Sequence, residues 1–304
     1  MSPQSGSSVS RPGCATTFTR SSRVAAGAWS PAWLAQIHSP RCKGGIHWHP
    51  VAKAIGLPVP NLLASAPGLA PHGFAFMLLE RLPGCDLGAA ISALSAGQRS
   101  AAARTVSGWQ RNAATLPHAK TFGYCTGPGA PPPHTTWADV LWADLERAAH
   151  WLKSAPWFRD RYVQRTRKYL ESMSPYWSNI QPVPHLPDTT TKNVIVHRGR
   201  VVGLIDVDEI CYGDPLQTVG LTLTALKAHA LSEDYVDTWC SAIGIDGDGR
   251  RAVSAYALLS CLTFMGETGQ NFNRSEDAAP NPSVRQRLAD MFEAFARPFE
   301  ARSR

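Results

Sequence analysis

Short apolar runs separated by turn residues fill the first third of the chain, a pattern typical of small strands and short helices. The apolar run at residues 74–79 (Phe-Ala-Phe-Met-Leu-Leu) has strand length and predicts a buried strand. Residues 59–64 are expected to be extended, and residues 49–55 to form a short helix. Pro and Gly in residues 80–84 predict a break, where a small N-terminal part gives way to a larger helical part.

Beyond this break, apolar positions recur at intervals of three and four residues, which indicates amphipathic helices. Helices are expected over residues 86–94, 95–116, 137–153 and 158–177, and again from about residue 216 to the C-terminus. Ser95 is the expected N-cap of the second of these helices. A Gly- and Pro-rich loop is expected over residues 121–136.

A β-hairpin interrupts this helical pattern. Residues 193–196 and 201–205 are short runs rich in branched apolar residues, and Gly199 marks the turn between them. A polar cluster, Asp-Thr-Thr-Thr-Lys-Asn at residues 188–193, precedes the hairpin. A second one, Asp-Val-Asp-Glu at residues 206–209, follows it.

Charge is distributed unevenly along the chain. The net charge is +7, and residues 1–79 contain six Lys or Arg but no Asp or Glu. The remaining 24 Lys and Arg nearly balance 23 Asp and Glu, and no stripe of aromatic and basic residues occurs, so no nucleic acid partner is expected. Residues 1–30 are expected to be largely disordered. Their Arg- and Ser-rich, acid-free composition also resembles a transit peptide. The abrupt change in composition after them also fits an altered start site or reading frame.

Composition favours a globular protein, because 44% of the residues are apolar. The 304 residues allow one large domain or two lobes around a cleft. The chain has no run of 18 apolar residues, so no membrane-spanning helix and no membrane partner are expected. The seven cysteines are widely spaced and form no C-x-x-C pair, which argues against a disulfide framework or a zinc ribbon. Isolated reduced thiols predict a cytoplasmic protein.

The two polar clusters beside the hairpin form the candidate chemical site. A tight hairpin folds back on itself, so Asn193, which enters it, and Asp206, which leaves it, should be neighbours in space. Their oxygen atoms suit Mg²⁺, which binds a few hard oxygen ligands and leaves its other positions to water and phosphate. Asp188 lies on a loop five residues before Asn193 and can face the same point as a base.

In this order the elements resemble the aminoglycoside phosphotransferase family, small-molecule kinases with the protein-kinase fold. The family has a catalytic Asp, four intervening residues and an Asn, then a hairpin that ends in Ile-Asp. Residues 188–193 and 205–206 match this pattern, and residues 213–215 match the family's Gly-Asp-Pro element. Residues 56–60 and 76–84 look like the approach to the hinge, so the resemblance covers about residues 50–304.

The resemblance implies an α+β, protein-kinase-like fold with two lobes. Residues 31–82 would form a small, incomplete N-terminal lobe and the hinge. Residues 83–304 would form a large, mostly helical C-terminal lobe that carries the catalytic loop and the metal-binding hairpin. The implied activity is an O-phosphotransferase reaction that uses ATP, or GTP, and Mg²⁺ and acts on a hydroxyl of a small molecule.

The resemblance also assigns roles to single residues. Asp188 would accept or orient the proton of the substrate hydroxyl, and Asn193 and Asp206 would hold Mg²⁺ against the nucleotide phosphates. Lys192 would reach the transferred phosphate. The adenine would be bound by the backbone of Glu80, Arg81 and Leu82. Losing either metal ligand should be severe, because such sites act mainly by positioning and charge neutralisation.

The chain departs from the family pattern near the catalytic loop. The family usually has a His two residues before the catalytic Asp, where it supports the loop; here Leu186 takes that place, and His185 is shifted by one. Thr218 stands where the family often has another Asp after the Gly-Asp-Pro element. Asp214 is expected to cap the helix that begins at Leu216 and to brace the loop.

The departure is larger in the small lobe. Kinase-like enzymes grip the phosphates with a strand Lys that a helix Glu orients. Because residues 1–79 contain no acidic residue, that pair cannot form there. Lys43 is the nearest candidate for the Lys, and Lys53 lies on the expected helix. The Lys-Gly-Gly run at residues 43–45 is too short for the family's Gly-rich hairpin.

Two other hypotheses stay open. A kinase-like pseudoenzyme would bind a ligand or a partner without turnover, which the missing Lys–Glu pair favours and the set of Asp188, Asn193 and Asp206 opposes. A zinc hydrolase would use His47 and His49 on one face of a strand, but the sequence identifies no third ligand.

The acceptor substrate is not defined by the sequence. A polycationic acceptor such as an aminoglycoside would require an acidic face. The acidic residues placed for such a face are Asp234, Asp237, Glu267, Glu276 and Asp277. They are scattered and equally typical of solvated surface charges, and members of the family phosphorylate diverse alcohols.

Overall fold

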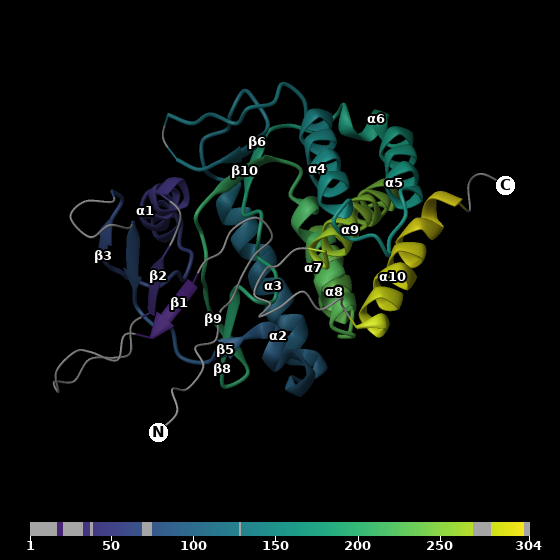
Figure 1. The fold of residues 1–304 in the computed structure, drawn as a ribbon. Helices are drawn as coiled ribbons and strands as arrows, with labels where there is room; N and C mark the ends of the chain where they lie inside the picture. Colours follow the sequence, from purple (N-terminus) through teal and green to yellow (C-terminus); the bar gives the residue numbers. More distant parts are fainter. Residues whose placement is uncertain are drawn as a thin grey trace.

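The N-terminal part of the chain folds as a four-stranded antiparallel sheet beside one helix, at the left of the view in Figure 1. The computed structural model describes residues 17–20, 33–36, 39–68, 75–127, 129–269 and 281–300. The strand order is β1 (Thr17–Arg20), β2 (Trp33–Gln36), β4 (Phe76–Leu79) and β3 (Leu62–Ala66), and α1 (Ser39–Ala54) follows β2. The strand expected at residues 74–79 is confirmed by β4, and residue 74 lies outside the described residues.

Only part of the chain before α1 is described. Of residues 1–30, β1 alone is described, so their expected disorder stays a prediction. The extended segment expected at residues 59–64 is observed as β3, which begins at Leu62 and ends at Ala66.

α1 is longer than the helix expected over residues 49–55, because it begins at Ser39 and contains Pro50. Close packing explains the difference. A Cβ on Gly44 would lie 2.2 Å from the carbonyl oxygen of Asp208, so only glycine permits this approach. Trp48 is buried and donates its Nε1 hydrogen to the carbonyl oxygen of Cys125 over 2.9 Å. These tertiary contacts outweigh the poor helix propensity of Gly and Pro.

Two three-stranded antiparallel sheets frame the polar clusters of the sequence. One has the order β5 (Cys85–Asp86), β8 (Val194–His197) and β9 (Arg200–Leu204), and the other has β6 (Gly123–Cys125), β10 (Ile210–Gly213) and β7 (Val183–His185). β8 and β9 are the expected hairpin. Its two turn residues, Arg198 and Gly199, have φ angles of 49° and 75°. Positive φ at both positions is typical of the type I′ turn, which matches the twist of the strands it joins.

Helices make up most of the remaining chain and lie at the centre and right of Figure 1. They are α2 (Leu87–Ala90), the 3₁₀ turn Ile91–Ala93, α3 (Ala96–Ala113), α4 (Trp137–Leu152), α5 (Arg161–Ser172), α6 (Ser174–Trp177), α7 (Leu216–Ala228), α8 (Asp234–Ile243), α9 (Gly247–Glu267) and α10 (Pro282–Glu300). The expected N-cap is confirmed, since Ser95 forms a capping box with Gln98. The helix expected over residues 158–177 is interrupted before Pro175, which stands in the first turn of α6.

The main core lies around α9, which packs against α4, α7 and α10. Tyr256, Leu258 and Leu262 of α9 are fully buried. Trp137 and Trp177 are buried as well. The six cysteines within the described residues are free thiols, and Cys85 is the exposed one among them. Within the same residues, no helix is long and apolar enough to cross a membrane.

Candidate active site

The loop between β7 and β8 carries the first polar cluster and has a defined local structure. Asp188 Oδ1 accepts hydrogen bonds from the backbone N–H of Thr190 over 3.3 Å and from its hydroxyl over 2.5 Å. Asn193 closes the loop, because its backbone N–H donates to the carbonyl oxygen of Thr190 over 3.0 Å. Its Nδ2 donates to the carbonyl oxygen of Asp188 over 3.0 Å. The sequence Asp-x4-Asn therefore forms one hydrogen-bonded loop.

The hairpin brings the second polar cluster to this loop. Val194 pairs with Leu204 in the β8–β9 ladder, and the next residue, Ile205, donates its N–H to the carbonyl oxygen of Asn193 over 2.9 Å. Asp206 follows directly. The expected proximity of Asn193 and Asp206 therefore agrees with the pairing of the hairpin.

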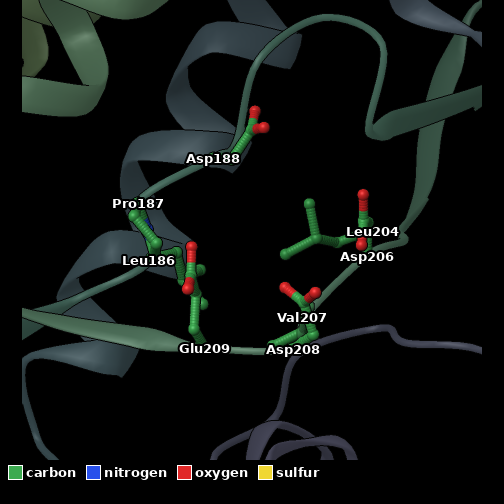
Figure 2. A pocket seen from close by; sticks show the side chains of 8 residues that line it. All are labelled: Leu186, Pro187, Asp188, Leu204, Asp206, Val207, Asp208 and Glu209. Carbon is green, nitrogen blue, oxygen red and sulfur yellow. The ribbon is translucent and has the colours of Figure 1, made fainter. Parts of the chain in front are cut away.

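Asp206 has an unusual backbone conformation, with a φ of 64°. This left-handed region costs little for Asp and Asn but is disfavoured for other residues with a Cβ atom. Such conformations persist where the surrounding structure imposes them, and they are frequent at functional sites. In Figure 2, Asp206 and Asp188 lie on opposite sides of one small pocket.

Asp208 and Glu209 also line this pocket, together with Leu186, Pro187, Leu204 and Val207. Both acids belong to the second polar cluster of the sequence, and no role was expected for either of them. Asp208 is buried, and Asn193 is buried too, although Asn193 is not among the lining residues. Four carboxyl groups therefore line the pocket, an arrangement suited to the hydroxyl of an acceptor.

Lys192 is half-buried, and its positive charge acts on the carboxyl group of Glu267 at the end of α9. Burial raises the pKa of Glu267 to about 8, and Lys192 opposes this rise. One carboxyl oxygen of Glu267, Oε1, is buried and has no hydrogen-bond partner in the described part of the chain. The expected contact of Lys192 with a transferred phosphate stays a prediction.

Asp214 is a structural residue, as expected. Its Oδ1 accepts the N–H of Leu216, the first residue of α7, over 2.9 Å. Its Oδ2 accepts hydrogen bonds from the hydroxyls of Tyr256 over 2.7 Å and Tyr176 over 3.1 Å. Burial raises the pKa of Asp214, and these three donors oppose that effect. The predicted brace between the Gly-Asp-Pro element and α7 is confirmed.

His185, one residue away from the family's histidine position, does not face the loop. Its ring is buried against Trp137, with the ring centroids 6.4 Å apart, and its Nδ1 lies 3.3 Å from the carbonyl oxygen of Val183. Burial lowers the pKa of His185 to about 4, so the ring is neutral at pH 7. Leu186 is buried as well, and among the described residues no histidine hydrogen-bonds to the loop between β7 and β8.

The residues expected to form the hinge follow β4 directly. Glu80 donates its backbone N–H to the carbonyl oxygen of Asn61 over 2.8 Å, and its Oε2 accepts from Asn61 Nδ2 over 2.5 Å. The N–H of Glu80 is therefore engaged within the protein. An adenine bound here would depend on its carbonyl oxygen and on the backbone of Arg81 and Leu82, so this binding stays a prediction.

The N-terminal sheet and α1 provide no Lys–Glu pair within the described residues. β2 contains no Lys, and α1 contains no Asp or Glu. Lys43 is an exposed residue of α1, and Lys53 hydrogen-bonds to Asn61. The glycines beside Lys43 pack against residue 208 rather than forming a loop over a phosphate.

The zinc hypothesis is wrong, because His47 and His49 lie on a helix and not on a strand. Two residues two positions apart on a helix point in different directions. His49 is buried, and its Nε2 lies 2.6 Å from the carbonyl oxygen of Pro60. Within the residues that the structure describes, no group of three metal-ligating side chains was found.

Of the acids named for an acceptor face, Asp234 and Asp237 lie in the first turn of α8 and Glu267 ends α9. Asp234 pairs with Arg99, with 2.6 Å between the Arg99 Nη2 and the Asp234 Oδ2 atoms. Glu267 lies near Lys192 instead. Glu276 and Asp277 lie outside the described residues.

Comparison with known proteins supports a phosphotransferase fold. Residues 20–256 match the family model APH, the phosphotransferase enzyme family. No curated protein matches the sequence. Among solved structures, a thermostable mutant of aminoglycoside phosphotransferase APH(4)-Ia in its apo form is 19% identical, with a TM-score of 0.60 over 92% of this chain and 95% of that chain.

Two further structures show the same likeness. ADP-bound aminoglycoside phosphotransferase APH(2'')-Ib is 12% identical, with a TM-score of 0.57 over 91% of this chain and 93% of that chain. The gentamicin complex of APH(2'')-IIa is 13% identical, with a TM-score of 0.58 over 88% and 87% of the two chains. At these identities the likeness establishes the fold, which is the α+β, protein-kinase-like fold expected from the sequence.

Proposed function

Because the chain belongs to the APH phosphotransferase enzyme family, we propose that it transfers the terminal phosphoryl group of ATP to a hydroxyl of a small molecule. One observation carries this proposal. Asp188 and Asp206 face each other across one pocket, and Asn193 hydrogen-bonds to the backbone of Asp188. This arrangement joins a base and two metal ligands on a single loop and hairpin.

Asp188 is the proposed base. Thr190 occupies its Oδ1 with two hydrogen bonds, which fixes the rotation of the carboxyl group. Oδ2 is then the atom proposed to receive the proton of the acceptor hydroxyl. In phosphoryl transfer the base mainly orients the nucleophile, and positioning contributes most of the rate.

The proposed Mg²⁺ ligands are Asn193 and Asp206, and their chemistry fits the ion. Asn193 directs its Nδ2 to the carbonyl oxygen of Asp188, which leaves its Oδ1 as the ligand atom. Asp206 supplies a carboxylate on the pocket wall. When bound, Mg²⁺ would neutralise charge on the phosphates. Asp206 would be held at the correct place by its fixed backbone conformation.

ATP is the proposed donor and a small hydroxylated molecule the proposed acceptor. Similar solved structures include complexes with ADP or AMP-PNP and hygromycin B, and complexes with gentamicin or with streptomycin and ATP. We propose Glu80, Arg81 and Leu82 as the adenine-binding backbone. Lys192 is the proposed contact of the transferred phosphate.

A phosphotransfer assay over a panel of acceptors tests the proposal. Wild-type protein is expected to transfer phosphate from Mg·ATP to at least one aminoglycoside, amino alcohol or sugar alcohol, and an Asp206→Ala variant is expected to be inactive. GTP in place of ATP tests the nucleotide preference. If the wild-type and Asp206→Ala proteins formed equal amounts of product, the activity would come from a contaminating enzyme.

A pseudoenzyme is the second candidate, because no Lys–Glu pair is present in the part of the N-terminal sheet and α1 that the structure describes. Titration calorimetry separates the two. The active enzyme requires Mg·ATP binding that Asp206→Ala weakens. A folded wild-type protein that binds no Mg·ATP would contradict the proposed activity.

A further inference from the structure

α3 places one polar side chain among the apolar residues of its buried face. Gln110 is 7% exposed, while Val106 and Ala113, which share this face, are 0% exposed. A buried carboxamide is costly unless its donors and acceptor are all engaged. Gln110 is engaged, and its partners are neither in α3 nor in another helix. They lie in the segment that leads into the catalytic loop.

Three hydrogen bonds connect Gln110 to this segment. Its Nε2 donates to the carbonyl oxygen of Leu186 over 2.9 Å and to Thr189 Oγ1 over 3.0 Å. Its Oε1 accepts the backbone N–H of Leu186 over 3.0 Å. Leu186 precedes Asp188 by two residues, and Thr189 follows it directly. Gln110 therefore holds the chain on both sides of the proposed base.

Burial and further contacts hold the anchor points. Leu186 and Thr189 are buried, and Thr189 Oγ1 also lies 3.4 Å from the Oγ1 atom of Thr218 on α7. Gln110 itself is fixed by the helix that carries it. Any shift of Leu186 would leave buried backbone groups without partners. The backbone on both sides of Asp188 is thus tied to α3.

We propose that Gln110 is the positioning residue of the catalytic loop. The inference rests on the proposed role of Asp188. In this chain Leu186 occupies the place where the resembled family has its supporting histidine, and His185 is directed into the core beside Trp137. The carboxamide of Gln110 reaches the loop from α3. It hydrogen-bonds to the backbone of Leu186, the residue at the family's histidine position.

The test is a double-mutant cycle with four proteins. Gln110→Met keeps the length and volume of the side chain but removes all three hydrogen bonds. Thr189→Val removes the bond between Gln110 and Thr189, together with the longer 3.4 Å contact of Thr189 with Thr218. The double variant completes the cycle. Ser107→Ala is the matched control, because Ser107 is also buried on α3 but hydrogen-bonds only to the carbonyl oxygen of Arg104 and to Arg111 of its own helix.

Gln110→Met is expected to lower kcat about 100-fold, since a misplacement of about 1 Å can have that effect. The KM for ATP should change less than about threefold, because the hinge is untouched. Thr189→Val should lower kcat less, and the double variant should be no worse than Gln110→Met. Ser107→Ala should resemble wild type.

Hydrogen exchange provides a readout that does not need activity. The amide of Leu186 donates to Gln110, so it should exchange at least about tenfold faster in Gln110→Met than in wild type or Ser107→Ala. A folded Gln110→Met protein with unchanged exchange at Leu186, or with unchanged kcat, would overturn the proposal. So would equal losses in Gln110→Met and Ser107→Ala.

The failure of the proposed function is distinguishable from the failure of this inference. A wild-type protein that transfers no phosphate to any acceptor contradicts the phosphotransferase proposal. In that case faster exchange at Leu186 still supports Gln110 as the residue that sets the loop. If Gln110→Met does not fold, the Thr189→Val variant decides the question. Unchanged kcat together with unchanged amide exchange at Leu186 in that variant would overturn the proposal.

Discussion

Asn193 holds Asp188 in place through a hydrogen bond that its Nδ2 donates to the carbonyl oxygen of Asp188 over 3.0 Å. The carbonyl oxygen of Asn193 also accepts the N–H of Ile205 over 2.9 Å, one residue before Asp206. One residue therefore connects the proposed base to the hairpin that carries the second metal ligand. Substitutions at this site must be chosen so that charge, oxygen ligands and backbone support are changed one at a time.

Replacement of Asp188 by Ala should abolish turnover and leave Mg·ATP binding nearly unchanged. The carboxyl group is expected to orient the acceptor hydroxyl, and loss of such a group lowers kcat about 100- to 10,000-fold. The bond from Asn193 reaches the backbone of residue 188, so it persists in the variant. Kinetics and calorimetry on the same sample provide the measurement. Turnover within about tenfold of wild type would show that Asp188 is not the base.

Replacement of Asp206 by Asn should separate its charge from its backbone conformation. Asn tolerates the φ of 64° as well as Asp does, so the free energy of unfolding should change by less than about 0.5 kcal/mol. The lost charge should lower kcat about 100-fold or more. Asp206→Ala should be destabilised by about 1 kcal/mol in addition, because Ala is disfavoured at positive φ. Urea unfolding and kinetics measure both effects, and equal stability of the two variants would contradict the assigned strain.

The sequence was sufficient to predict the hairpin, the α3 cap at Ser95 and the closeness of Asn193 and Asp206. These features depend on local rules, because turn residues, caps and strand pairing are encoded within a few positions. The role of Asp214 at the start of α7 followed in the same way. Each of these predictions used residues that are near one another in the chain.

Features that depend on distant contacts were not predicted. The extent of α1 depends on the packing of Gly44 against residue 208, which no local pattern indicates. Gln110 is 76 residues from Leu186 in sequence. A signal for it did exist, because Gln110 falls on the apolar stripe of α3 between Val106 and Ala113. A polar residue in such a stripe indicates a buried hydrogen-bond partner, but the sequence does not show which one.

Tyr256→Phe and Tyr176→Phe form a matched pair that measures the brace at Asp214. Tyr256 is fully buried, donates to Asp214 and accepts the Nε1 hydrogen of Trp137 over 2.7 Å. Its loss leaves two buried polar groups short of a partner, so the free energy of unfolding should fall by about 2–3 kcal/mol. Tyr176 is half-buried and makes one longer bond of 3.1 Å, so its loss should cost about 1 kcal/mol or less. Urea unfolding measures the difference. Equal effects would contradict the assignment of Tyr256 as the main support.

Glu267 should make the stability of the protein depend on pH. Burial raises its pKa from 4.5 to about 8 in the folded state, whereas the unfolded chain has the ordinary value. The folded protein therefore binds this proton more tightly. The resulting stabilisation is fully present below about pH 4.5 and is lost as the pH rises through about 8. Each unit of pKa difference corresponds to about 1.4 kcal/mol, so the effect amounts to a few kcal/mol at most.

A Glu267→Gln variant isolates this contribution, because Gln keeps the size of the side chain and does not titrate. Relative to wild type, the variant should gain stability between pH 5 and pH 9, as measured by urea unfolding at both values. Asp290→Asn is the control, since it removes the same charge from an exposed position on α10. The charge of Lys192 should limit the gain, because Lys192 favours the ionised form of Glu267. A difference between Glu267→Gln and wild type that is the same at both pH values would show that Glu267 does not titrate in this range.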